Sequence, residues 1–79
     1  MNTDELFTAI KANLSDLKSA MPVGELFFTL GMDGSSLAAE VEVSRTLRSN
    51  SFRQRLRESG IDFYLHRDGK IEFVEVSHA

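Results

Sequence analysis

The chain has 79 residues, of which 42% are hydrophobic and 27% are charged, and this composition is typical of one small globular domain. It contains no cysteine, which excludes a disulfide and a thiolate zinc site, and no apolar run approaches the roughly 18 residues that span a bilayer. The net charge is −3 at pH 7. The acidic beginning of the chain lacks the pattern of a signal peptide, so we expect a cytoplasmic protein with no membrane contact.

Residues 3–21 predict an amphipathic helix. Thr3 suits the N-cap position, and apolar side chains then recur at spacings of four, four and three residues: Leu6, Ile10, Leu14 and Leu17. Pro22 and Gly24 are expected to end this helix, because the residue before a proline disfavours the α conformation.

Residues 25–43 predict an antiparallel hairpin, because apolar and polar residues alternate along two runs. Leu26, Phe28 and Leu30 are expected to share one face of the first strand. Residues 31–36 are rich in turn-forming types. The second strand is then expected to place four side chains on one face: Leu37, Ala39, Val41 and Val43.

A second, short helix is predicted over residues 51–59. Ser51 and Gln54 fit a capping box, and Gly60 fits the position that follows a helix C-cap. A longer helix beginning at residue 44 is excluded, because Leu47 would then lie roughly 180° from Leu56 and the two could not share a core face.

A second hairpin is predicted over residues 61–76, where two alternating runs flank the strong turn signal Asp68-Gly69. The order repeats the first helix and hairpin, and the pattern leaves open whether the two halves are a duplication. The sequence therefore predicts an α+β fold in a single domain of residues 1–79, with the element order helix-hairpin-helix-hairpin (αββαββ). We expect a four-stranded antiparallel sheet with two helices on one face, and frayed residues 76–79.

The chain has few residues of the types that usually act in catalysis or bind metal ions. His66 and His78 lie beside the second hairpin turn and near the end of the chain, with no nucleophile placed for them to activate. A metal site of His66 with His78, Glu72 or Glu75 lacks a recognisable ligand spacing. The turn at residues 31–34 lacks the Gly-Lys-Ser/Thr ending of a phosphate-binding loop. We therefore expect a protein that is not an enzyme and holds no metal or cofactor.

The charge is unevenly distributed. Residues 44–67 carry six arginines and two carboxylates, a net charge of +4, whereas the rest of the chain carries three lysines and ten carboxylates, a net charge of −7. Because the guanidinium group is a planar fork suited to carboxylates and phosphates, this segment predicts a partner-binding surface. Its candidate residues are Arg45, Arg48, Arg53, Arg55, Arg57, Arg67 and the strand residue Tyr64.

Three interpretations of the arginines remain open. They pair with carboxylates of the same chain (Glu40, Glu42, Glu58 and Asp62 lie nearby in sequence), they bind an acidic surface of another protein, or they bind nucleic acid. We favour a protein-binding adaptor or inhibitor over nucleic acid, because an overall negative charge repels a polyanion.

Self-association is a further expectation. Edge strands pair readily with another copy, so the C-terminal strand Ile71–Val76 is the expected contact of a homodimer. In length and mild acidity the chain is similar to small phage-encoded inhibitors such as anti-CRISPR proteins, and this likeness implies a protein that occupies a partner's surface.

Overall fold

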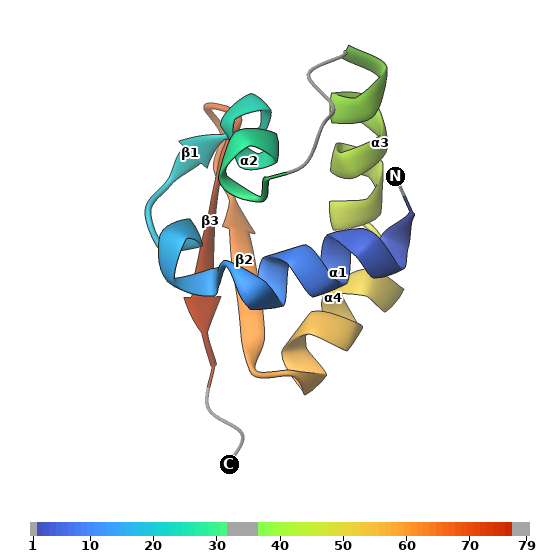
Figure 1. Cartoon of the computed structure of the whole chain (residues 1–79), viewed down its shortest axis with the longest axis vertical. Helices are drawn as coiled ribbons and strands as arrows, with labels where there is room; N and C mark the ends of the chain where they lie inside the picture. Colours follow the sequence, from blue (N-terminus) through green and yellow to red (C-terminus); the bar gives the residue numbers. More distant parts are fainter. Residues whose placement is uncertain (1, 32–36, 77–79) are drawn as a thin grey trace.

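The computed structural model describes residues 2–31 and 37–76 of the chain (Figure 1). These residues form four α-helices, one short 3₁₀ helix and three strands: α1 (Thr3–Ala12), η1 (Leu14–Leu17), β1 (Met21–Pro22), α2 (Val23–Thr29), α3 (Leu37–Leu47), α4 (Asn50–Glu58), β2 (Ile61–Leu65) and β3 (Lys70–Glu75). The predicted α+β class is confirmed, but the predicted order of elements is not.

The three strands form one antiparallel sheet in the order β1-β3-β2. The predicted second hairpin is confirmed as β2 and β3, with Phe63 opposite Phe73 and their ring centroids 5.7 Å apart. Gly69 in the connecting turn has φ +87°, a conformation that residues with a Cβ adopt only with strain. Met21 of β1 pairs with Ile71, so β3 lies in the middle of the sheet at this end.

The first helix is shorter than predicted. Asn2, rather than Thr3, is its N-cap, and the Asn2 side chain accepts a hydrogen bond from the backbone N–H of Glu5 at 2.7 Å. At the other end, the side-chain amide of Asn13 donates to the carbonyl of Ala9 at 2.8 Å, and the chain continues as η1 instead of α-helix. Pro22 precedes α2 as its N-cap residue.

The predicted first hairpin is wrong, because its two strands are the helices α2 and α3. The buried side chains of the first of these helices are Leu26 and Phe27, and the C-cap residue Leu30 is buried beside them, a spacing of one and three residues that defines a helix face. Phe28, which the alternating pattern placed inside, is 90% exposed. Of the predicted turn at residues 31–36, residues 32–36 lie outside the described part of the chain.

The second predicted strand of that hairpin is α3, which buries residues four apart. Its core side chains are Val43 and Leu47, whereas Val41, which was expected to share a face with Val43, is half exposed. The sheet consequently has three strands among the described residues instead of four. Because the described residues between 25 and 43 belong to the helices α2 and α3, they form no hairpin. The idea of a duplicated helix-hairpin unit therefore loses its basis.

The predicted break ahead of the second helix is confirmed. α3 ends at Leu47 and α4 begins at Asn50, so Leu47 and Leu56 both reach the core from separate helices. Ser49 is the N-cap residue instead of Ser51, and its hydroxyl lies 2.9 Å from that of Ser51. Gly60 follows the helix with φ +81°, as predicted for the position after the C-cap.

One core joins all these elements. Its buried side chains come from every helix and strand of the described residues: Leu6, Ile10, Leu17, Met21, Leu26, Phe27, Leu30, Val43, Leu47, Phe52, Leu56, Ile61, Phe63, Ile71 and Phe73. Figure 1 shows α1 crossing the centre of the molecule and α3 at its margin, beyond α2 and the sheet. None of the helices in the described ranges has the length and hydropathy needed to cross a bilayer.

Candidate functional site

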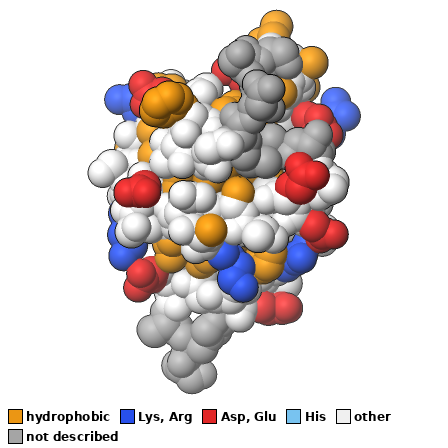
Figure 2. Space-filling model, viewed as in Figure 1, with side chains coloured by type: hydrophobic (Ala, Val, Ile, Leu, Met, Phe, Trp, Pro, Cys, Tyr) orange, Lys and Arg blue, Asp and Glu red, His pale blue; other side chains and the backbone are white. Residues whose placement is uncertain are grey.

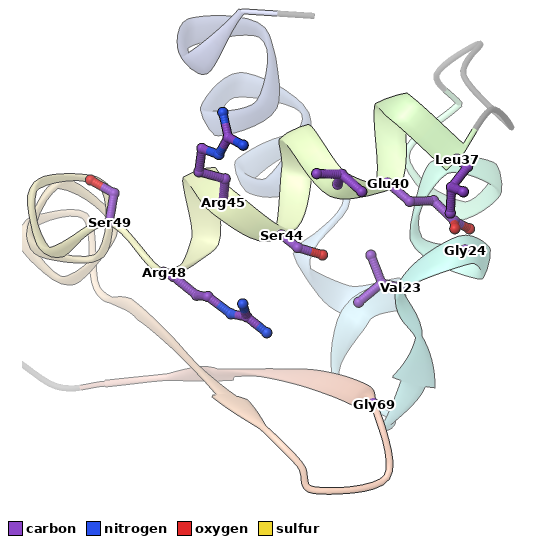
Figure 3. Close-up of a pocket in the computed structure, with 10 residues that line it drawn as sticks. Val23, Gly24, Leu37, Glu40, Ser44, Arg45, Arg48, Ser49 and Gly69 are labelled. Atoms are coloured by element: carbon purple, nitrogen blue, oxygen red, sulfur yellow. The ribbon is translucent and has the colours of Figure 1, made fainter.

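A hollow of the described surface lies between α3, the start of α2 and the β2–β3 turn (Figure 3). It has a volume of about 730 Å³, and we call it the Arg48 groove. Its lining residues are Val23, Gly24, Leu37, Glu40, Val41, Ser44, Arg45, Arg48, Ser49 and Gly69. The groove therefore combines apolar side chains and hydroxyl groups with two arginines near one end and a carboxylate near the other.

Arg48 occupies the junction of three adjoining hollows. Besides the groove, it lines a hollow of about 410 Å³ that includes Tyr64 and Leu65, and another of about 140 Å³ that includes His66 and Lys70. In Figure 3 its side chain extends from the end of α3 toward the β2–β3 hairpin. Within the described part of the chain, the Arg48 guanidinium has no hydrogen bond or ion pair. It is therefore available to an anionic ligand.

Two further predicted arginines share this lack of a partner among residues 2–31 and 37–76. Arg45 lines the groove, but its side chain points away from that of Arg48 in Figure 3. Arg67 is exposed in the β2–β3 turn. Tyr64, which the sequence singled out, is 54% exposed on β2 and shares a hollow with Arg48.

The arginines of α4 have partners within the chain. Arg53 donates from Nε to Oδ1 of Asp62 at 2.9 Å and lies over the Phe63 ring at 5.4 Å. The Nε of Arg57 lies 3.8 Å from Oδ2 of the same carboxylate. Arg55 donates to Asp4 at 2.6 Å and stacks 4.0 Å from the centroid of the Phe7 ring. These three side chains tie α4 to β2 and α1.

Asp62 is the buried acid of this cluster. Burial by itself raises the pKa of its carboxyl group. The hydrogen bonds from Arg53 and from the backbone N–H of Phe63, together with the charges of Arg53 and Arg57, outweigh burial and hold the pKa below its ordinary value. Asp62 is thus ionised at neutral pH and compensates the arginines beside it.

The structure divides the seven predicted site residues into two groups. Arg48, Arg45 and Tyr64 lie around connected hollows with Arg67 in the nearby turn, whereas Arg53, Arg55 and Arg57 hold elements of the fold together. The hydroxyl and apolar groove residues of α2 and α3 carry no signal in the sequence. These residues converge only because α3 is a helix. The sequence predicted a strand there, and they could therefore not be identified from it.

Two further predictions from the sequence concern a metal site around His66 and a free sheet edge at the C-terminal strand. His66 Nε2 lies 2.7 Å from Glu72 Oε1, and the described residues contain no cluster of three side chains suited to a metal ion. His78 lies outside those residues. The prediction of a free sheet edge at Ile71–Val76 is wrong in part, because β1 pairs with Ile71. Near the other end of β3, the Lys18 side chain donates a hydrogen bond to Glu75 at 2.8 Å.

Comparisons with known proteins add no relative to this description. No family model, no curated protein and no solved structure matches the chain. A function for the chain must therefore be argued from the groove and its charges.

Proposed function

We propose that this protein is a non-enzymatic interaction module that binds an acidic segment of another protein in the Arg48 groove. One observation carries the proposal: Arg48 lines three adjoining hollows, and no described residue neutralises its side chain. A guanidinium group binds a carboxylate through two parallel hydrogen bonds, which gives geometric selectivity as well as affinity.

The surroundings of Arg48 support a peptide-like ligand. Tyr64, Leu65 and Val41 are about half exposed beside it, and together they offer apolar contact around a central cation. Arginine and tyrosine are among the residues that contribute most to protein interfaces. The expected ligand is a segment in which acidic side chains alternate with apolar ones.

Nucleic acid remains the second candidate, because of one topological observation. α3 and α4 are joined by the two residues Arg48 and Ser49 and are followed by a hairpin with Arg67 in its turn. Helix–turn–helix proteins use the second helix of such a pair to read the major groove. Here, however, the arginines of that helix are matched by Asp62 and Asp4, and the whole chain carries a charge of −3.

Fluorescence anisotropy tests the proposal. The probes are a labelled peptide of alternating Glu and Leu, a matched peptide of Lys and Leu, and labelled single- and double-stranded oligonucleotides, each at about 50 and about 200 mM salt. We expect the acidic peptide to bind and Arg48→Gln to weaken it about tenfold, because a charge-assisted hydrogen bond contributes roughly 1.5–3 kcal/mol.

Lys11→Gln is the control for charge. It removes one positive charge from an exposed side chain of α1 outside the groove, and we expect it to change the affinity less than twofold. Equal binding of the acidic and basic peptides, or equal loss in the two variants, would contradict the proposed site. Oligonucleotide binding that collapses at the higher salt and is lost in Arg48→Gln would favour the second candidate.

A further inference from the structure

The Arg48 groove has opposite charges toward its two ends. Several of its lining residues come from α3 and recur three or four positions apart, so they follow one side of the helix: Leu37, Glu40, Val41, Ser44, Arg45 and Arg48. Glu40 and Arg48 are separated by about 12 Å along the helix axis, at 1.5 Å per residue. In Figure 3 the Glu40 side chain extends toward Gly24, whereas that of Arg48 extends toward the β2–β3 hairpin.

Glu40, like Arg48, has no charged partner among the described residues. Within residues 2–31 and 37–76, no basic side chain forms an ion pair with it, although it is partly buried. Gly24 makes room for its carboxylate, because a Cβ at that position would lie 2.6 Å from Glu40 Oε1. A partly buried carboxylate is stabilised by a cation beside it, so this end of the groove favours a positively charged group of a ligand.

The groove between these two charges is narrow. Its volume of about 730 Å³ extends from Leu37 to Arg48 along about 16 Å of helix, which leaves a mean cross-section of roughly 45 Å². An α-helix with its side chains is about 10–12 Å across and fills roughly twice that section. An extended segment fits better, because it rises about 3.3 Å per residue and places every second residue on one side. Four residues of such a segment span about 13 Å, which matches the separation of Glu40 and Arg48.

We propose that the segment bound in the Arg48 groove is extended and carries an acidic and a basic residue four positions apart, with an apolar residue midway between them. The acidic residue pairs with Arg48, the basic residue pairs with Glu40, and the apolar residue contacts Val23 and Val41. This inference rests on the proposed function and adds the order of charges that a partner must have. Figure 2 shows acidic and basic side chains interspersed over that face of the molecule, so selectivity comes from individual charges at fixed distances and not from a broad field of one sign.

Fluorescence anisotropy with labelled peptides tests this order of charges at about 50 mM salt, where ion pairs are weakly screened. The probes carry Glu-Ser-Leu-Ser-Lys or the reversed Lys-Ser-Leu-Ser-Glu between Gly-Ser flanks, and each reference peptide has Gln in place of Lys. A further probe separates Glu and Lys by about seven positions, the spacing that suits a helical ligand. We expect one of the two charge orders to bind about tenfold more tightly than its Gln reference, because a charge-assisted hydrogen bond is stronger than a neutral one.

Substitutions of Glu40 show whether this carboxylate binds the lysine of the probe. Glu40→Gln is expected to remove the advantage of lysine and to leave binding of the Gln reference peptide within about twofold. Glu25→Gln changes an exposed side chain of α2 that does not line the groove, so this matched control should keep the advantage. Glu40→Lys should reverse the preference, so that a peptide with Glu in place of Lys binds more tightly. Circular dichroism verifies that each variant remains folded.

The results separate this inference from the proposed function. If the Gln reference peptides bind and lose affinity in Arg48→Gln while lysine adds nothing, the order of charges is wrong and the acidic-peptide site stands. An advantage of lysine that survives Glu40→Gln, or a preference for the helical spacing, also overturns the inference. If no probe binds in a manner that depends on Arg48, the proposed function fails and this inference fails with it.

Discussion

At the scale of single residues, Asp62 shows that some of the clustered arginines stabilise the fold through ion pairs within the chain. Its side chain is 12% exposed and accepts hydrogen bonds from Arg53 and from its neighbour's backbone, while Arg57 lies within 4 Å. A buried carboxylate without such partners would be costly. Arg53 and Arg57 are thus structural, and their removal affects folding before it affects binding.

The lowered pKa of Asp62 makes stability depend on pH. Because the pKa of this carboxyl group is lower in the folded chain than in the unfolded one, its contribution is fully present above the unfolded pKa of about 3.9. The contribution is lost as pH falls through the folded value. We expect the free energy of unfolding, measured by urea denaturation, to fall steeply below about pH 4.

Asp62→Asn tests the origin of that dependence. The variant is expected to lose about 1–3 kcal/mol at pH 7, because Arg53 keeps only a neutral partner, and to show a flatter profile below about pH 4. Glu75→Gln is the control, since its pair with Lys18 is exposed and should leave the stability unchanged. An Asp62→Asn profile parallel to that of the original chain would show that other carboxylates cause the acid loss.

At the scale of elements, residues 25–30 illustrate how an alternating pattern misleads. Leu-Phe-Phe-Thr-Leu satisfies both a strand that buries Leu26, Phe28 and Leu30 and a helix that buries Leu26, Phe27 and Leu30. In a short apolar run, periodicity alone does not separate the two. The surrounding core selects the helix, and it turns Phe28 out to solvent.

Paired alanine substitutions distinguish the helix from the strand. Phe27→Ala is expected to cost about 3–5 kcal/mol, because it removes a fully packed aromatic ring from the core. Phe28→Ala is expected to change the stability by less than about 0.5 kcal/mol, because the ring is exposed. Thermal or urea unfolding measures both. The opposite ranking would restore the strand and remove α2 from the fold.

At the scale of the whole molecule, the core has no independent parts. Leu6 and Ile10 of α1 are fully buried in the same cluster as Phe73 of β3 and Leu56 of α4. A domain of this size buries a modest fraction of its surface, so each element depends on the others. Unfolding should therefore be a single cooperative transition.

Ile10→Ala tests this cooperativity from the N-terminal helix. We expect a loss of about 2–5 kcal/mol, because the substitution leaves a cavity at a fully buried site. Far-ultraviolet circular dichroism and the fluorescence of Tyr64 on β2 should give coincident transitions in the variant and in the original chain. If the Tyr64 transition kept its midpoint while the helical signal shifted, the hairpin would be stable without α1.

The sequence by itself determined the elements whose signals are local. The second hairpin follows from Asp68-Gly69 between alternating runs, and the end of α4 follows from Gly60. The start of α4 near residue 50 follows from the angle of roughly 180° that would separate Leu47 from Leu56 in one continuous helix. The concentration of arginine was equally visible, so Arg48 and Tyr64 could be named as candidates.

Tertiary structure decided which of those arginines are available. Arg55 is neutralised by Asp4, 51 residues away, and Arg53 by a carboxylate that α4 covers only after the chain folds. Tertiary packing also chose helices for residues 23–29 and 37–47, where the local pattern was ambiguous, and this choice created the Arg48 groove. The physical reason is the same in each case: burial and ion pairing depend on neighbours in space, and a single sequence specifies those neighbours only through the whole fold.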